Sequence, residues 1–220
     1  MKKEWNFKRE LARKFVHLLS VFIILIYFVV SDMFNTTVAL VILVFMLVFA
    51  LEFEYLRLET GKKIPVLGEI WKYVRRDKEQ DKLGGDVFLL LGAIIVLAIF
   101  DTNVAMAAIL MTTFGDLSAA LIGSKFGKRK VFQNRNKTWA GVFAELTTNI
   151  LIGIFVFFIF ARPEINVVGL IVIILVMAFT ATFVETLANK IDDNLLIPIF
   201  AGLNGHITLW IVVRYFSMGI

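Results

Sequence analysis

The sequence predicts an all-α integral membrane protein, a bundle of about seven transmembrane helices with its N-terminus in the cytoplasm. Three observations lead to this fold class. The 220 residues are 59% hydrophobic, with a mean hydropathy of +0.83. The apolar residues gather into seven long runs, as expected for segments that lie in lipid. The loops between these runs alternate between Lys/Arg-rich and Lys/Arg-poor.

Each predicted span is a run of mostly apolar residues close to the roughly 20 that a helix needs to cross a bilayer. The first run follows a basic start but is long and lacks a small-residue cleavage site, so we expect a retained helix rather than a signal peptide. The chain is too short for a bundle and a second folded domain, so we expect one transmembrane domain over residues 1–220. The spans are 15–31, 36–52, 86–100, 103–122, 141–161, 166–187 and 195–214.

Lys and Arg are confined almost entirely to one set of connections. Of the 23 such residues, 21 lie in the N-terminus, in the 53–85 and 123–140 loops and at Lys190, which leaves Arg162 and Arg214. The positive-inside rule places the basic segments in the cytoplasm. Without a targeting segment we expect a prokaryotic cell membrane, with the endoplasmic reticulum as the alternative in a eukaryote. Positive charge beside membrane segments indicates anionic lipid headgroups or phosphates as partners, and no nucleic acid.

The 53–85 loop contains one amphipathic stretch. Leu67, Ile70, Trp71 and Val74 have the i, i+3, i+4, i+7 spacing of one helical face. Basic residues surround them, which favours an interfacial helix on the cytoplasmic leaflet. The alternative is a solvated connecting loop. The chain has no cysteine, which excludes disulfides and thiolate metal sites.

Acidic residues gather at the predicted cytoplasmic ends of the later spans. They are Asp116, Glu145, Glu185, Asp192 and Asp193. Ionisable side chains in spans are costly and usually functional. Several carboxylates at one depth with few basic partners favour Mg²⁺, which takes one or two carboxylates together with phosphate oxygens. The alternative is that each acid only caps a helix or extends towards the membrane surface.

The segment 114–130 carries the densest set of small and polar residues. Asp116, Ala119, Ala120 and Gly123 fall on one helical face, where small side chains let a neighbouring helix or ligand approach closely. Gly123 and Gly127 then allow backbone N–H groups to point at an anion. The alternative is a basic loop that only sets topology. The pattern is not a P-loop, because the G-x-x-x-x-G-K-[ST] motif is absent.

Span five opens after Asn136-Lys137-Thr138. We expect Thr138 to cap that helix, whose N-terminus favours phosphate. Near the chain start, Arg13 and His17 share a helix face beside Lys14. There the alternative is that the basic residues set topology and that His17 packs in the bundle.

The end of the chain supplies further polar residues. Asn189 shares a helix face with Glu185, Asp192 and Asp193 if helix six continues that far. Pro198 is expected in the first turn of span seven, where proline suits a helix start. His206 is expected to have a satisfied packing role.

These motifs resemble the CTP-dependent polyprenol kinase family, which covers dolichol kinase, phytol kinase and CTP-dependent diacylglycerol kinase and is related to the phosphatidate cytidylyltransferases. The resemblance covers nearly the whole chain in order. The kinase branch is favoured by its ending, and the cytidylyltransferases' own C-terminal signature, with Lys-Asp and His-Gly-Gly elements, is absent. The matching residues are Arg13-Lys14-Phe15-Val16-His17, Gly115-Asp116, Gly123 to Lys128, Asn136-Lys137-Thr138 with Gly141, Val184-Glu185, and Asp192 to Pro198.

One position departs from the family pattern. The family usually has Glu before the glycine that opens span five, and this chain has Ala140 before Gly141. Either that Glu is dispensable or Glu145, a little over a turn further on, substitutes for it.

The resemblance implies a CTP-dependent lipid kinase that transfers the γ-phosphate of CTP, with Mg²⁺, to a long-chain isoprenoid alcohol of the dolichol, polyprenol or phytol type at the cytoplasmic face. The residues it implies fall into three groups. The catalytic residues are Asp116, Glu185, Asp193 and His17, and the metal ligands are Asp116, Glu185, Asp192 and Asp193. The nucleotide-binding residues are Gly115, Gly123, Lys125, Gly127, Lys128, Lys137, Thr138, Arg13, Lys14 and Asn194.

Two other functions stay open from the sequence. A cytidylyltransferase, forming a CDP-activated lipid of the CDP-diacylglycerol or CDP-archaeol type, would use the same loop and metal. A small transporter or anion-binding membrane protein would carry charged or broken helices at the membrane midplane. Here only Gly202, Gly205 and His206 lie at that depth, so a transporter is disfavoured.

Overall fold

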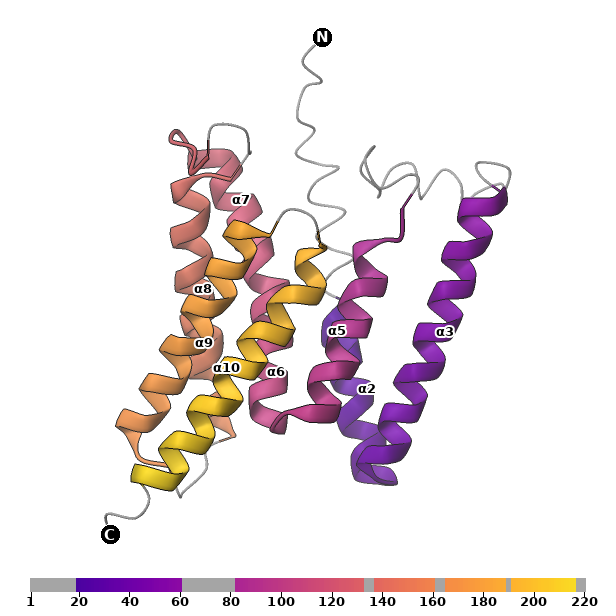
Figure 1. Cartoon of the computed structure of the whole chain (residues 1–220), viewed down its shortest axis with the longest axis horizontal. Helices are drawn as coiled ribbons and strands as arrows, with labels where there is room; N and C mark the ends of the chain where they lie inside the picture. Colours follow the sequence, from indigo (N-terminus) through magenta and orange to yellow (C-terminus); the bar gives the residue numbers. More distant parts are fainter. Residues whose placement is uncertain (1–18, 61–81, 133–136, 161–164, 189–190, 217–220) are drawn as a thin grey trace. The chain divides into compact units, whose positions relative to one another are not determined.

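The computed structural model describes residues 19–60, 82–132, 137–160, 165–188 and 191–216 (Figure 1). These residues are helical, apart from an isolated antiparallel bridge between Lys130 and Thr138 and the connecting turns. The helices are α2 (Leu19–Met33), α3 (Thr36–Thr60), α5 (Gly85–Ile99), α6 (Thr102–Leu110), the π-helical turn η3 (Met111–Gly115), α7 (Asp116–Phe126), α8 (Trp139–Ile159), α9 (Val167–Leu187) and α10 (Asp193–Phe216).

A helix lies in the described part of each of the seven predicted spans, but the helices differ in length. Five are long and apolar enough to cross a membrane: Thr36–Glu59, Thr102–Phe126, Trp139–Ile159, Val167–Leu187 and Asp193–Tyr215. Ser20–Met33 and Gly85–Ile99 are apolar but shorter. The all-helical fold is therefore confirmed for the described residues, whereas the count of seven spans and the cytoplasmic N-terminus stay predictions. The amphipathic stretch at 67–74 lies outside the described residues.

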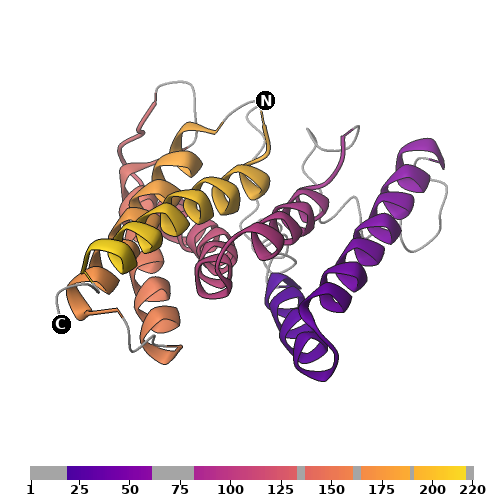
Figure 2. The same ribbon diagram turned by 60° about the horizontal axis from the view of Figure 1, so that its bottom comes forward.

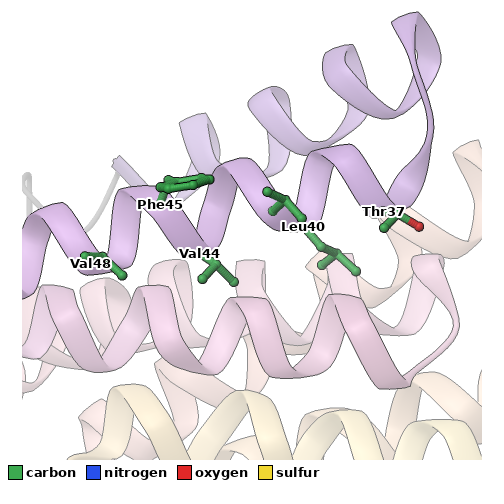
Figure 3. A pocket seen from close by; sticks show the side chains of 6 residues that line it. Thr37, Leu40, Val44, Phe45 and Val48 are labelled. Carbon is green, nitrogen blue, oxygen red and sulfur yellow. The ribbon is translucent and has the colours of Figure 1, made fainter.

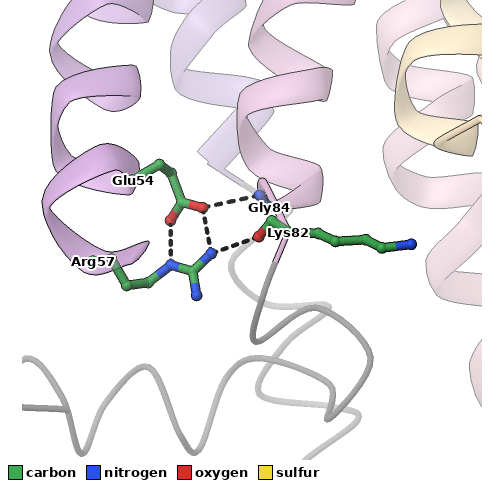
Figure 4. A network of polar contacts seen from close by, with 4 residues as sticks. All are labelled: Glu54, Arg57, Lys82 and Gly84. Atoms are coloured by element: carbon green, nitrogen blue, oxygen red, sulfur yellow. Dashed lines mark hydrogen bonds and ion pairs between the residues drawn. The ribbon is translucent and has the colours of Figure 1, made fainter. Parts of the chain in front are cut away.

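The chain divides into two compact units, Met1–Leu91 and Gly92–Ile220. In the first unit α2 packs against α3. Near the end of α3, the Arg57 guanidinium donates two hydrogen bonds to the Glu54 carboxylate, at 3.1 and 2.9 Å (Figure 4). Glu54 also accepts from the Gly84 N–H at 3.0 Å, and Arg57 donates to the Lys82 carbonyl. The two buried side chains therefore fasten the end of α3 to the start of α5.

One face of α3 carries a shallow hollow of about 380 Å³. Its lining comes from α3 alone and is aliphatic or aromatic except for Thr37 (Figure 3). Only 11% of the most apolar window of this helix is buried. Apolar exposure of this kind is what a helix in contact with lipid tails needs. The lining residues are Thr37, Leu40, Val41, Val44, Phe45 and Val48.

The second unit is built from four long helical segments. The first is the continuous rod of α6, η3 and α7, and α9 packs between α8 and α10 (Figures 1 and 2). The rod packs against α8 and α10. Large side chains from every segment are fully enclosed between them, and these include Ile109, Met111, Val156, Ile173, Met177 and Ile197.

Short polar side chains start the helices of this unit. Asp101 accepts a hydrogen bond from the Asn103 N–H, Thr138 from the Gly141 N–H and Asn166 from the Gly169 N–H. Each satisfies a backbone donor that the first helical turn leaves unpaired, which stabilises a helix by about 1 kcal/mol. The predicted cap at Thr138 is confirmed.

Two expectations about α10 have different outcomes. Pro198 is not in the first turn, because α10 already begins at Asp193. The proline lacks the N–H that would bond the Asn194 carbonyl four residues earlier, and Gly92 makes room beside this turn: a Cβ there would lie 2.9 Å from Pro198 Cγ. The packing role of His206 is confirmed, because its Nδ1 accepts from the Asp101 N–H at 3.1 Å.

Candidate functional site

Several polar residues of the second unit meet at one end of it, where α7 and α9 end and α8 and α10 begin (Figure 1). The contact that joins these ends is made by Lys137, just before α8. Its Nζ lies 3.1 Å from Glu185 Oε1 in the last turns of α9. It also donates to the Glu185 backbone carbonyl. That carbonyl is one of the last four of the helix, which have no intrahelical donor. Lys137 thus pairs with the Glu185 carboxylate and also supplies a hydrogen-bond donor to a backbone carbonyl at the end of α9.

Glu145 lies beside this ion pair, one and a half turns into α8. Its side chain is 1% exposed, and Oε2 has no hydrogen-bond partner among the described residues. The carboxyl groups of Glu145 and Glu185 are within hydrogen-bonding reach, and Lys137 and Asp193 lie within electrostatic range. Among the described residues, three carboxyl groups therefore lie around one lysine, and Glu145 Oε2 lacks a hydrogen-bond donor.

Asn149 extends this arrangement one turn deeper along α8. It is fully buried, and its Nδ2 donates to Thr182 Oγ1 on α9 at 3.1 Å. Its Oδ1 has no partner in the described structure. We call Lys137, Glu145, Asn149, Thr182 and Glu185 the polar cluster. A buried acceptor without a hydrogen-bond donor destabilises a folded protein by about 1–3 kcal/mol. Glu145 Oε2 and Asn149 Oδ1, which we call the two bare acceptors, therefore lower the stability of the protein when no ligand is bound.

The rod of α6 and α7 closes the cluster on its third side. At Gly115, the last residue of η3, a Cβ would lie 2.5 Å from Asn149 Oδ1 and 3.2 Å from Glu145 Cγ. Only glycine therefore allows the rod to approach the two bare acceptors. Single π-helical turns inside α-helices occur frequently at functional sites. Asp116 follows Gly115 directly and opens α7.

The predicted small-residue face of α7 packs on the start of α8. A Cβ on Gly141 would lie 2.9 Å from the Ala119 carbonyl, and one on Gly123 would lie 3.0 Å from Thr138 Oγ1. Gly127 ends α7, and a Cβ there would lie 2.1 Å from the Gly123 carbonyl oxygen. Its φ of −74° is ordinary, so space rather than backbone conformation requires glycine. The close helix approach predicted from the sequence is thus present.

The basic turn after α7 folds back towards α8. Val131 N–H donates to the Lys137 carbonyl at 2.9 Å, and Trp139 N–H to the Arg129 carbonyl at 3.1 Å. The turn thereby holds Lys137 beside the end of α7. Lys125 and Lys128 are exposed, and Lys125 Nζ lies 5.4 Å from the centre of the Phe126 ring. Neither lysine is among the described neighbours of the polar cluster.

The predicted residues at the start of α10 have separate roles. Asp192 Oδ1 accepts from the Asn194 N–H at 3.0 Å and from its Nδ2 at 2.8 Å. Asp192 therefore acts as a helix cap and holds the side chain of Asn194, which is buried. Asp193, in the first turn, is the residue of this group that lies within electrostatic range of Glu145.

Several predictions about the site are not tested by this geometry. Arg13, Lys14, His17 and Asn136 lie outside the described residues. Within the described ranges, no group of three or more His, Asp or Glu side chains is arranged to hold a metal ion by itself. Mg²⁺ commonly takes only one or two protein carboxylates and completes its shell with phosphate oxygens and water. The oxygen donors of Glu185 and Asp193 suit that mode of binding.

Two residues of the cluster, Asn149 and Thr182, have no role in the sequence analysis. Glu145 was predicted there as an acid inside a span and as one of two explanations for the missing family Glu, and the structure places it beside Glu185. The signal for Asn149 is its spacing: it lies four residues after Glu145 in an otherwise apolar run, which puts both on one helical face.

Comparison with curated proteins confirms the resemblance seen in the motifs. The chain is 25% identical to phytol kinase 1, chloroplastic, of Arabidopsis thaliana over 61% of this chain and 46% of that protein. It is 27% identical to the Arabidopsis thaliana farnesol kinase, chloroplastic, over 64% of this chain and 48% of that protein. It is 26% identical to CTP-dependent diacylglycerol kinase 1 of Schizosaccharomyces pombe, over 56% of this chain and 60% of that protein.

These relatives are kinases of the family that the sequence resembles. The chain spans about half the length of the curated relatives it matches. No family model matches the chain. No solved structure matches it either.

Proposed function

We propose that this protein is a CTP-dependent lipid kinase that phosphorylates a long-chain isoprenoid alcohol at the cytoplasmic face of a cell membrane, in a prokaryote. The observation that carries the proposal is the polar cluster, in which one lysine and several carboxylates meet where membrane-spanning helices end. Phosphoryl transfer requires little from a protein beyond positioning and neutralisation of charge. The names of the curated relatives, which are kinases of phytol, farnesol and diacylglycerol, support the same reaction class.

The reaction moves one phosphoryl group. The oxygen of the lipid alcohol forms a bond to the γ-phosphorus of CTP. The bond from that phosphorus to the bridging oxygen breaks, and CDP leaves with the electron pair. The hydroxyl proton passes to one of the carboxylates of the site, with Asp116, Glu185 and Asp193 as the candidates.

The chain's own residues would bind the nucleotide from two sides. Lys137 would hold a terminal phosphate as a point charge, because it is held at the mouth of the site by the turn that precedes α8. Lys125 and Lys128, on the exposed turn, would contact the outer phosphates. The N-terminus of α8, opened by Thr138, favours an anion through its dipole and free N–H groups. The nucleotide-binding roles of Gly115, Gly123, Gly127 and Asn194 are part of the same proposal, as are those of Arg13 and Lys14.

Mg²⁺ would neutralise charge on the phosphates, with Asp116, Glu185 and Asp193 as its protein ligands and Asp192 as a capping neighbour. The donor set is oxygen only, which this hard cation prefers. His17 would complete the anion site from the N-terminal segment.

The proposal is tested with the full chain purified in detergent, given Mg²⁺, CTP and separately phytol, farnesol or diacylglycerol. We expect a phosphorylated lipid from one of the isoprenoid alcohols. Asp116→Asn should insert normally and lose at least about 100-fold in rate, because removing a charged ligand at the phosphates costs about 3 kcal/mol or more of transition-state stabilisation. An Asp116→Asn protein with full activity would contradict the metal assignment, and absence of any phosphorylated lipid would contradict the kinase.

A further inference from the structure

The two bare acceptors of the polar cluster lie side by side on α8 and face the glycine of the π-helical turn. Glu145 Oε2 and Asn149 Oδ1 come from residues four apart, and both side chains are almost fully enclosed. The Cβ position of Gly115 lies within 2.5 Å of one and beside the stem of the other. Both atoms are acceptors, so what completes them is a donor of hydrogen bonds.

Their depth indicates what kind of donor can reach them. At a rise of about 1.5 Å per residue, Glu145 lies about 9 Å and Asn149 about 15 Å along α8 from its first residue, Trp139. A nucleotide's phosphates belong at the mouth of the site, near Lys137. The deeper acceptors are in the apolar part of a helix long enough to span a membrane. A ligand that comes from the bilayer and carries a single O–H group would supply the donor that this position lacks.

We propose that Glu145 and Asn149 bind the hydroxyl of the lipid substrate, whose single hydrogen is donated to the deeper acceptor, Asn149 Oδ1, beside Glu145, and so select a neutral alcohol over a lipid phosphate. This inference rests on the proposed function for the identity of the reaction. A phosphate monoester brings further acceptors and negative charge to two acceptors that need a donor. An alcohol brings the missing donor and no charge.

The rest of the cluster explains why these two side chains stay in place without substrate. Asn149 is fixed through its other end, because Nδ2 donates to Thr182 Oγ1. Glu185, on the neighbouring helix α9, is held by Lys137 through the ion pair at 3.1 Å. The acceptors are therefore oriented in advance, and the binding of the hydroxyl removes the penalty of leaving them bare.

The test measures binding without CTP, so that it does not depend on catalysis. Radiolabelled farnesol is bound to the full chain in detergent and displaced by unlabelled farnesol, by farnesyl methyl ether, which has the same chain and oxygen but no hydrogen to donate, or by farnesyl monophosphate. We expect the wild type to prefer farnesol to the ether by about tenfold, the value of one well-placed hydrogen bond of about 1.4 kcal/mol. The monophosphate should compete more weakly than farnesol.

The chain offers a matched control for the variant. Asn149→Leu removes the deeper acceptor, and the preference for farnesol over the ether should fall to about twofold or less. Asn204→Leu removes a chemically identical link, since Asn204 Nδ2 donates to Thr180 Oγ1 at 3.1 Å between α10 and α9, and it should keep the full preference. Asn149→Ala is a second variant with a smaller side chain, which serves if the leucine variant does not fold. It should also lose the preference for farnesol over the ether.

The outcomes separate this inference from the proposed function. Equal affinity of the wild type for farnesol and its ether, or a preference that Asn149→Leu and Asn149→Ala both retain, would overturn the inference even if phosphate transfer occurs; the acceptors would then be satisfied by water or by packing. A tenfold preference lost in the Asn149 variants would support it even if no lipid is phosphorylated, and in that case the kinase would be the part that fails.

Discussion

Replacing Lys137 by methionine tests the electrostatics of the site most severely. Its Nζ lies 3.1 Å from Glu185 Oε1, and the two side chains are 23% and 9% exposed. At that separation and an effective dielectric constant of 20, the attraction amounts to about 5 kcal/mol before the cost of desolvation. Removing one partner of a buried pair typically destabilises a protein by about 3–5 kcal/mol, because the other charge is left uncompensated. Here two further carboxylates, Glu145 and Asp193, lose the same cation.

We therefore expect Lys137→Met to unfold at a lower temperature and to lose at least about 100-fold in kcat/KM for CTP, since a charge-assisted contact to phosphate contributes about 3 kcal/mol. Melting in detergent and phosphate transfer to farnesol measure the two effects. The double variant Lys137→Met/Glu185→Gln separates them: it should recover part of the lost stability, because the carboxylate that paired directly with Lys137 is gone, without recovering activity. Arg214→Met is the control, since the Arg214 guanidinium lies exposed over Trp210 and should change neither quantity. A Lys137→Met protein with unchanged melting and full transfer would refute the reasoning.

Three further predictions concern the scaffold. Arg57→Met should destabilise the protein by about 3 kcal/mol, because buried Glu54 loses its partner; exposed Glu52→Gln on the same helix should shift melting little, and equal shifts would contradict the role of the pair. Gly127→Ala should lower both expression of folded protein and activity, because its Cβ would lie 2.1 Å from a backbone oxygen; a folded, active variant would show that the turn can move. Thr138→Val should cost about 1 kcal/mol in thermal stability through the lost cap, which Thr138→Ser should largely restore.

The apolar runs made the helices predictable. Each run is long enough to be read as a span, and Thr138 stands directly before one of them, so both the helices and this cap could be placed from local pattern. The close approach at Gly123 and Gly141 could also be predicted, because small residues four apart on one face imply a near neighbour.

The partners within the site could not be predicted in the same way. Lys137 and Glu185 are 48 residues apart, and no periodicity links a turn before one helix to the end of another. The π-helical turn at Met111–Gly115 lies in a run that reads as an ordinary helix. Pro198 was misplaced because the helix start depends on the Asp192 cap, so that α10 begins at Asp193, five residues before the proline. Asn149 was overlooked because a single amide in an apolar helix has many roles, and only the structure shows that its oxygen has no donor.

The most direct test of the central claim follows the phosphorus atoms of CTP. The purified full chain receives farnesol or phytol, Mg²⁺ and CTP labelled at either the γ- or the α-phosphorus, and the lipid fraction is counted. A lipid kinase transfers the γ label alone and releases labelled CDP from the α-labelled nucleotide. Label that reached the lipid from the α position, when a lipid phosphate is supplied, would make the protein a cytidylyltransferase and contradict the account.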